Sequence, residues 1–209
     1  MTVINSLSSS LGQKGNDANI ALAKEIAEAN NYDAIKELVD NLNHKDKRIQ
    51  ADCIKTLYET AYIKPELIAE YYIDFLNLLT NKNNRLVWGG MIAIMTITEL
   101  KHENIFASID LISEAIAKGS VITTDCGVEI LTKLNKYDKY FNKTEPLLTE
   151  QLWKCPIKQL PQYMEKSVIS ITKQNKEIYQ KIINERKTEC DKDSQVKRLE
   201  KILKKIAII

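Results

Sequence analysis

The sequence has few of the residues that build tight turns, and this scarcity excludes several fold classes. Among its 209 residues are only 6 glycines and 4 prolines, whereas a sandwich or barrel of many short strands needs a turn-forming residue at each of many corners. Hydrophobic residues make up 44% of the chain and charged residues 28%. That composition excludes disorder for the bulk of the chain and favours an all-helical protein.

Long hydrophobic runs and a strong charge of one sign are also missing. The longest nearly apolar stretch, 86–98, is too short to cross a bilayer, and the polar residues 1–16 lack the apolar segment of a signal peptide. The formal net charge is +2, which gives no strong field toward nucleic acid or membrane. We therefore expect a cytoplasmic protein with no membrane span.

Motifs for catalysis, metal binding or cofactor binding are absent from the sequence. There is no Gly-rich phosphate loop, no His-Glu-x-x-His and no Gly-x-Ser-x-Gly. The four cysteines are far apart, with no Cys-x-x-Cys pair, which favours buried thiols. The two histidines, His44 and His102, fall in predicted turns. We expect no enzymatic activity, no catalytic residue, no metal site and no cofactor.

Apolar residues recur at helical spacing from residue 16 onward, and this pattern itself repeats. Predicted helices open at Arg48, at Arg85 and near Val121, which lie 37 and 36 residues apart. A second helix is predicted after each of them, over 65–79, 103–118 and 145–154. A fixed period of this length indicates stacked helical repeats.

These units resemble HEAT and armadillo repeats, whose first helix opens with Asp-x-x-Arg or a close variant. Lys45-Asp46-Lys47-Arg48 and Lys82-Asn83-Asn84-Arg85 hold that place, and the third copy lacks the arginine. The resemblance implies an all-α superhelix, a solenoid of about five helical hairpins plus a C-terminal capping helix, because one hairpin cannot bury both of its apolar faces alone. An irregular helical bundle is the alternative.

The domain organisation follows from the same pattern. Residues 1–15 are rich in Ser and Gly and have no periodic apolar residues, so we expect a flexible tail that is dispensable for folding. Residues 16–209 are expected to form a single helical-repeat domain.

In HEAT-like repeats the second helices line the concave face, which directs attention to their polar positions. Glu70 and Asp74 lie one helical turn apart, as do Asp110 and Glu114, so they predict an acidic surface that binds a basic protein or peptide; a solvated face is the alternative. Trp88, beside Gly89 and Gly90, indicates either close helix packing or a ligand groove. The predicted partner-binding residues are Glu70, Asp74, Asn77, Asp110, Glu114 and Trp88.

The C-terminal part of the chain is basic. Residues 1–110 contain 11 basic and 15 acidic residues, whereas residues 111–209 contain 19 basic and 13 acidic ones. Residues 193–207 form a basic amphipathic pattern. This segment is predicted to cap the solenoid with its apolar face or, alternatively, to contact a phosphate backbone or an anionic surface.

The sequence therefore predicts a non-enzymatic scaffold that binds a protein or peptide partner on its concave face. The alternative is a nucleic-acid-binding protein or a DNA glycosylase of HEAT-like fold, with Trp88, Asp125 and Trp153 as its candidate base-holding residues. The near-neutral net charge argues against neutralisation of a phosphate backbone. An acidic concave surface would favour the scaffold, and a basic one would favour nucleic acid.

Overall fold

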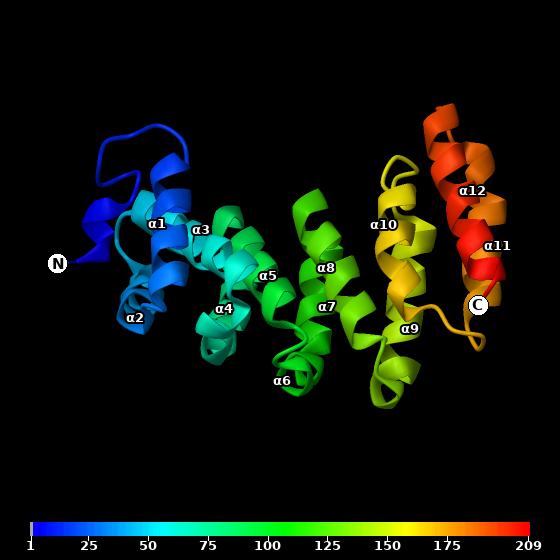
Figure 1. Ribbon diagram of the computed structural model, residues 1–209, viewed down its shortest axis with the longest axis horizontal. Coiled ribbons are helices and arrows are strands. Elements are labelled where there is room, and N and C mark those ends of the chain that lie inside the picture. Colours follow the sequence, from blue (N-terminus) through cyan, green and yellow to red (C-terminus); the bar gives the residue numbers. More distant parts are fainter. Residues whose placement is uncertain (1) are drawn as a thin grey trace. The chain divides into compact units, whose positions relative to one another are not determined.

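The computed structural model describes residues 2–209, and within that range it contains twelve α-helices and no strand (Figure 1). The expected all-α fold is confirmed. The helices are α1 (Asp17–Ala29), α2 (Tyr32–Asp40), α3 (Lys47–Ile63), α4 (Tyr72–Leu78), α5 (Asn84–Ile97), α6 (His102–Ala107), α7 (Ile109–Lys118), α8 (Val121–Leu134), α9 (Asp138–Lys154), α10 (Leu160–Ser167), α11 (Lys176–Arg186) and α12 (Asp193–Ala207). None of the helices in the described part of the chain is both long and apolar enough to cross a membrane.

The chain divides into two compact units, and the division falls within α8. Unit 1 comprises Met1–Cys126 and unit 2 comprises Gly127–Ile209. The sequence predicted a single domain over 16–209, and periodicity could not reveal this division because α8 continues through it.

The core of unit 1 is built by α1, α3 and α5, which lie side by side (Figure 1). Met91 and Ile94 of α5 are fully buried, as an apolar helix in the middle of a repeat array requires. Gly89 and Gly90 let the neighbouring helices approach α5 closely. A Cβ atom on Gly89 would lie 2.3 Å from Cγ1 of Ile54 in α3, and one on Gly90 would lie 2.9 Å from the carbonyl oxygen of Phe75 in α4.

Matching caps begin the two long helices α3 and α5. The Asp46 carboxylate accepts a hydrogen bond from the Arg48 backbone N–H (2.8 Å), and the Asn83 side chain accepts one from the Arg85 backbone N–H (3.1 Å). Asp and Asn are favoured at this position because their side chains bond to the free N–H groups of the first turn. The caps therefore place Arg48 and Arg85 at equivalent positions of successive helices.

The second helices of the repeats differ from the prediction. Residues 65–79 do not form one helix: two 3-10 turns, Pro65–Leu67 and Ala69–Tyr71, precede α4. In those turns the N–H groups of Ile68 and Tyr71 bond to carbonyls three residues earlier, so the α-helical spacing is lost.

The other second helices also change their bounds. The predicted helix over 103–118 is divided into α6 and α7 at Ser108, a residue type that favours helix ends over helix interiors. The helix predicted over 145–154 is the later part of α9, which begins at Asp138 and contains Pro146.

Residues 2–16, here called the N-terminal arm, fall in the segment that was expected to be a flexible tail, and they pack against the helices of unit 1. Val3–Ser6 form a 3-10 helix, and the Leu7 side chain is 0% exposed. The Ser9 backbone N–H donates to Oδ2 of Asp52 in α3 (2.7 Å), and Asn19 donates to Oδ1 of the same carboxylate (2.9 Å). Whether the arm is dispensable for folding stays a prediction.

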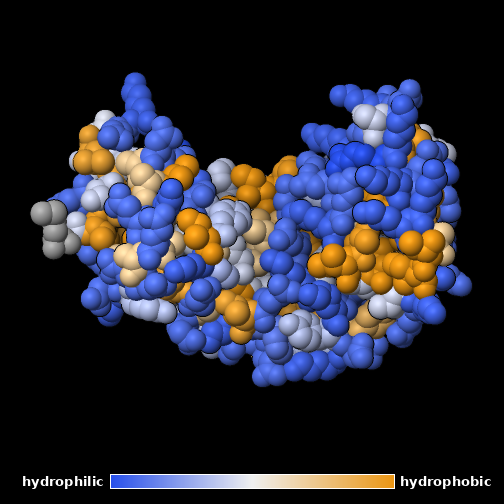
Figure 2. Space-filling view, in the orientation of Figure 1, coloured by the Kyte–Doolittle hydropathy of each residue, from blue (hydrophilic) through white to orange (hydrophobic). Residues whose placement is uncertain are grey.

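The C-terminal helix α12 caps unit 2, as one of the two interpretations predicted. Its apolar face packs against α10 and α11, with Leu199, Ile202 and Ile206 buried. The Arg198 guanidinium makes two hydrogen bonds to Glu165 of α10, at 2.8 and 2.7 Å. Hydrophilic side chains cover much of the visible surface of unit 2, with a hydrophobic patch among them (Figure 2).

Buried polar contacts connect the helices of unit 2. The Glu145 carboxylate of α9 accepts hydrogen bonds from Asn135 (2.5 Å), Asn175 (3.2 Å) and the Tyr179 hydroxyl (3.1 Å). Burial, together with the nearby Glu145 carboxylate, raises the pKa of Tyr179 above its ordinary value. These contacts join α9 to α11.

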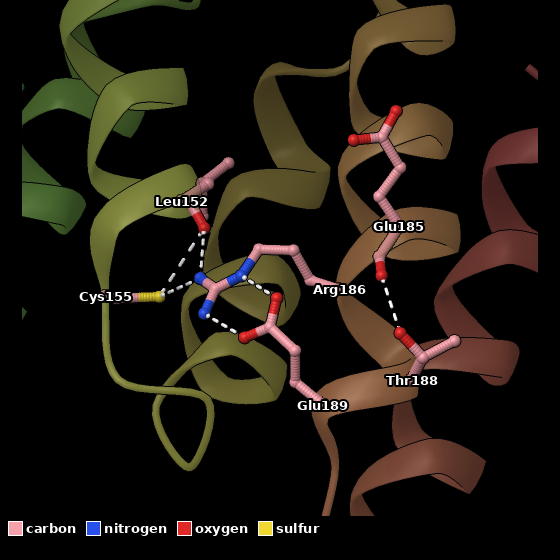
Figure 3. Close-up of polar contacts among 6 residues, drawn as sticks. All are labelled: Leu152, Cys155, Glu185, Arg186, Thr188 and Glu189. Carbon is pink, nitrogen blue, oxygen red and sulfur yellow. Dashed lines mark hydrogen bonds and ion pairs between the residues drawn. The ribbon is translucent and has the colours of Figure 1, made fainter.

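A buried arginine makes the second polar connection (Figure 3). Arg186, at the end of α11, donates from Nη1 to the carbonyl oxygen of Leu152 (2.9 Å) and to Sγ of Cys155 (3.5 Å). Its Nε and Nη2 atoms donate to the Glu189 carboxylate. One guanidinium therefore satisfies a carbonyl in the last turn of α9 and an acidic side chain in the turn after α11.

Candidate functional site

Unit 1 carries a groove with a volume of about 640 Å³. Its walls come from the N-terminal arm, from one face each of α3 and α5, and from the first turn of α8. We refer to this surface as the groove; it is lined by Ser8, Ser9, Gly12, Gln13, Lys14, Gly15, Asn16, Arg48, Ala51, Asp52, Ile54, Lys55, Tyr58, Arg85, Trp88, Gly89, Ile92 and Ile122.

The floor of the groove is aromatic and aliphatic. Trp88 of α5 and Tyr58 of α3 are both half-buried, and the buried Ile54 of α3 packs against Gly89 at the base of the lining. An aromatic side chain that is half-buried beside a hollow offers a flat contact surface at low entropic cost. The glycines thus permit close packing, as one interpretation of Trp88-Gly89-Gly90 predicted, and Trp88 lines a groove. Whether the groove binds a ligand stays a prediction.

Arg48 and Arg85 occupy equivalent positions in the groove but have different partners. The Arg48 guanidinium forms an ion pair with Asp46 (2.7 Å), and hydrogen bonds from Arg48 lower the pKa of the Asp46 carboxyl to about 2. The residue at the matching position before Arg85 is Asn83, which has no charge. Among the described residues Arg85 has no ion-pair partner, so its exposed guanidinium is free for a ligand.

Two lysines add to the positive charge of the groove. Lys55 of α3 pairs with Glu59 (2.6 Å) and lies over the Tyr58 ring, 4.8 Å from its centroid. Lys14 is an exposed residue of the N-terminal arm and, within the described chain, has no ion-pair partner. Lys14 and Arg85 are therefore the cations of the groove that remain open.

Asp52 is the acidic residue of the groove lining, and its oxygens already accept hydrogen bonds. Oδ2 accepts from the Ser9 backbone and Oδ1 from the Asn19 side chain. The Asn19 side-chain oxygen in turn accepts from the Ser8 backbone N–H at 2.9 Å. Asp52 thus fixes the arm at the rim of the groove.

A second hollow of about 550 Å³ lies on the other side of Trp88. It is lined by the loop between α4 and α5 and by residues of α7 and the start of α8, among them Glu114 and Lys118. Trp88 lines both hollows.

The predicted partner-binding residues lie on the surface, but the structure does not gather them in the groove. Glu70, in the 3-10 turn before α4, pairs with Lys101 (2.6 Å), and Glu114 of α7 pairs with Lys118. Asp74 and Asn77 on α4 and Asp110 on α7 are exposed. Of the predicted set, Trp88 lines the groove and both Trp88 and Glu114 line the second hollow. Their role in binding stays a prediction.

The sequence contained a signal for the groove that the prediction did not use. Arg48 and Arg85 were identified as the openings of two repeats 37 residues apart. We assigned the binding surface to the second helices, whereas the groove is lined by the first helices, α3 and α5, on which those arginines lie. Asp52 and Lys14 could not be found in this way, because the arm was expected to be flexible.

The candidate residues for a DNA glycosylase lie in both units. Trp88 and Asp125 belong to unit 1, whereas Trp153 lies on α9 in unit 2. Within residues 2–209, no three His, Cys, Asp or Glu side chains gather in a way that could hold a metal ion.

Comparison with known proteins identifies the fold. No family model and no curated protein matches the chain. An engineered protein solved by a structural genomics consortium is 17% identical, with a TM-score of 0.63 and coverage of 99% of both chains. A computationally designed armadillo repeat protein for modular peptide recognition is 13% identical, with a TM-score of 0.65 and coverage of 97% of this chain and 90% of that one.

A second designed armadillo repeat protein, solved in complex with the peptide (KR)4, is 14% identical. The match covers 97% of this chain and 88% of that chain, with a TM-score of 0.64. At these identities the likeness concerns the fold. It agrees with the period of 36 to 37 residues and with the stacked helices α1, α3 and α5. The chain therefore has an armadillo/HEAT-like helical-repeat fold.

Proposed function

We propose that this protein is a non-enzymatic scaffold that binds a peptide segment of a partner protein in the groove of unit 1. The observation that carries the proposal is the groove itself: an open hollow with Trp88 and Tyr58 on its floor and hydrogen-bonding side chains along its rim. Aromatic anchors beside polar groups are typical of surfaces that bind peptides.

Two further observations support a peptide as the ligand. The groove is formed by neighbouring long helices of a repeat array, which offer a continuous surface to an extended chain. Two of the similar solved structures are designed armadillo proteins, one intended for modular peptide recognition and one bound to a peptide.

The cations of the groove raise the alternative of nucleic acid, but the surrounding charges favour a peptide. A protein that follows a nucleic-acid strand needs a series of cations free to neutralise phosphates. Here Arg48 and Lys55 are already paired with Asp46 and Glu59, and the Asp52 carboxylate lies among them. Cytoplasmic localisation remains part of the proposal.

The proposal is tested by selecting ligands from a random peptide library on the whole protein. We expect selected peptides to bind saturably, and Trp88→Ala to weaken binding at least about tenfold, a loss of about 1.4 kcal/mol. Trp153→Ala, the matched change on unit 2, should leave the affinity unchanged. Circular dichroism checks that both variants are folded. Failure to select any peptide, or full binding by Trp88→Ala, would contradict the proposal.

A further inference from the structure

We infer that the groove binds an acidic peptide segment, rich in Asp or Glu. The inference rests on the proposed function and specifies the chemistry of the partner. It reverses the sign expected from the sequence, which placed an acidic surface for a basic partner on the second helices.

The first argument is the difference between the two helix caps. Asp46 caps α3 and also pairs with the Arg48 guanidinium, so this arginine is already neutralised. Asn83 caps α5 equally well but carries no charge, and the Arg85 guanidinium is left without a carboxylate. A guanidinium whose N–H donors are free favours a carboxylate ligand. It binds the two carboxylate oxygens through two parallel hydrogen bonds.

The second argument is that the groove lining holds four cations, Lys14, Arg48, Lys55 and Arg85, and a single carboxylate, Asp52. Both Asp52 oxygens accept hydrogen bonds, one from the arm and one from Asn19. The nearby Asp46 and Glu59 carboxylates are paired with Arg48 and Lys55. A basic ligand would have to share Asp52 with the arm and Asn19, whereas an acidic ligand meets Arg85 and Lys14 directly.

The third argument is the direction of the helices. Arg48 and Arg85 lie in the first turns of α3 and α5, so the groove includes the N-terminal ends of helices of 17 and 14 residues. The aligned peptide dipoles of a helix favour negative charge at this end. They add to the attraction of Arg85 for an acidic side chain.

These contacts define a binding mode. A carboxylate of the ligand accepts hydrogen bonds from the Arg85 guanidinium, and a neighbouring acidic residue meets Lys14 on the arm. The aliphatic parts of the ligand pack on Trp88, one helical turn after Arg85, and on Tyr58. The arm is therefore part of the site, because it both closes the rim and supplies a cation.

The test uses the intrinsic fluorescence of Trp88. In a full-length Trp153→Phe variant, Trp88 is the remaining tryptophan of the chain's 2. Its emission reports on the two hollows that it lines, of which only the groove is also lined by Arg85 and Lys14. Hexaglutamate, hexalysine and an oligothymidylate are titrated separately at low salt. We expect hexaglutamate to change the emission saturably, hexalysine to leave it unchanged, and the oligothymidylate to bind more weakly. Added salt should weaken hexaglutamate binding, because exposed charges are screened.

Charge-removing variants locate the contact. Arg85→Gln should weaken hexaglutamate binding about tenfold, the loss of one charge-assisted contact, and Lys14→Gln should weaken it by a smaller factor. Lys82→Gln is the matched control, because Lys82 is an exposed cation before α5 that does not line the groove. It should bind as the parent does.

Each other outcome overturns the inference in a distinct way. If hexalysine binds and hexaglutamate does not, the sign of the partner is wrong while the groove still binds peptides. Tighter binding of the oligothymidylate would identify a nucleic-acid site. An equal loss in Lys82→Gln and Arg85→Gln would show attraction by net charge without a site. If no probe changes Trp88 and no library peptide is selected, the proposed function fails as well.

Discussion

The two units hold their helices together by different means. In unit 1, α3 and α5 approach closely because Gly89 has no side chain where Ile54 packs. In unit 2, α9 and α11 are joined through buried hydrogen bonds to Glu145 and from Arg186. Close apolar packing therefore dominates the contact between α3 and α5 in the first unit, and hydrogen bonds add to the contact between α9 and α11 in the second.

This difference determines which side chains are left for a ligand. The Arg186 guanidinium of unit 2 is buried and bonded to Leu152, Cys155 and Glu189, so it has a structural role (Figure 3). The Arg85 guanidinium of unit 1 is exposed beside a hollow. Two arginines of one chain thus have different surroundings, and the proposed ligand contact belongs to the exposed one.

The two tryptophans allow the units to be followed separately. Trp88 lies in unit 1 and Trp153 in unit 2, and both are half-buried. In single-tryptophan variants, unfolding monitored by fluorescence reports on one unit at a time.

The largest effect is expected from Ile94→Ala in unit 1. Ile94 is fully buried, and truncation should lower the free energy of unfolding by about 2–5 kcal/mol, because a cavity is left in the core. In urea denaturation, the unfolding transition reported by Trp88 should occur at a lower urea concentration than the one reported by Trp153. Ile73→Ala is the control, since Ile73 is 55% exposed. A loss below about 1 kcal/mol would contradict the packing described.

Removing the buried arginine should affect unit 2. Arg186→Leu leaves the Leu152 carbonyl with only the weak Cys155 thiol donor and leaves Glu189 without its arginine, and we expect a loss of about 2–3 kcal/mol in the transition reported by Trp153. Arg198→Leu is the matched change in the same unit, where the ion pair with Glu165 is half-exposed, and should cost less than about 1 kcal/mol. Equal losses would show that burial does not distinguish the two arginines.

The N-terminal arm provides a third test. Composition alone predicted that deleting residues 1–15 does not change stability. The burial of Leu7 instead predicts that the deletion lowers the free energy of unfolding, as reported by Trp88 fluorescence, by about 2 kcal/mol. Leu7→Ala should reproduce most of it, and Leu11→Ala, at a side chain that is 51% exposed, should not. An unchanged melting temperature after the deletion would mean that the arm contributes nothing to folding.

Gly89→Ala should give a smaller loss, of about 1–2 kcal/mol, because the added methyl group collides with Ile54. The sign of this change in stability is informative, because a Gly→Ala substitution in an unobstructed helix stabilises the protein by about 1 kcal/mol. In an Ile54→Ala background the two closest contacts, to Cγ1 and Cγ2, are removed and only the Cβ at 3.2 Å remains, so the added methyl group should cost much less or become neutral. Destabilisation of the same size in both backgrounds would exclude the collision as the cause.

The smallest expected effect concerns thiol reactivity. Burial, with the nearby Asp52 and Glu37 carboxylates, raises the pKa of Cys53 from 9.0 to about 12. The thiol therefore stays protonated in the folded state, and its contribution to stability, present below pH 9, is lost as the pH rises toward 12. Iodoacetamide at about pH 8 should label half-exposed Cys190 first and Cys53 only on unfolding. Early labelling of Cys53 would show that unit 1 opens.

Local patterns predicted most of the helices, and contacts distant in sequence account for what was missed. The amphipathic pattern over 193–207 gave α12 with its observed bounds, because one apolar face is visible in its own sequence. The arm was missed because its partner, Asp52, lies 43 residues after Ser9. The groove between the first helices was not predicted, because periodicity gives the buried face of a helix but does not say beside which neighbouring helix a hollow is left.

The most direct test of the account is to map where an acidic peptide binds by nuclear magnetic resonance. Hexaglutamate is added to the ¹⁵N-labelled full-length protein, and backbone, indole and guanidinium signals are followed. We predict that the saturable shifts lie in unit 1, at Lys14, Arg85 and the indole N–H of Trp88. Shifts confined to the basic face of α12, at Lys197, Lys201 and Lys204, would contradict the account and make the C-terminal helix the binding surface.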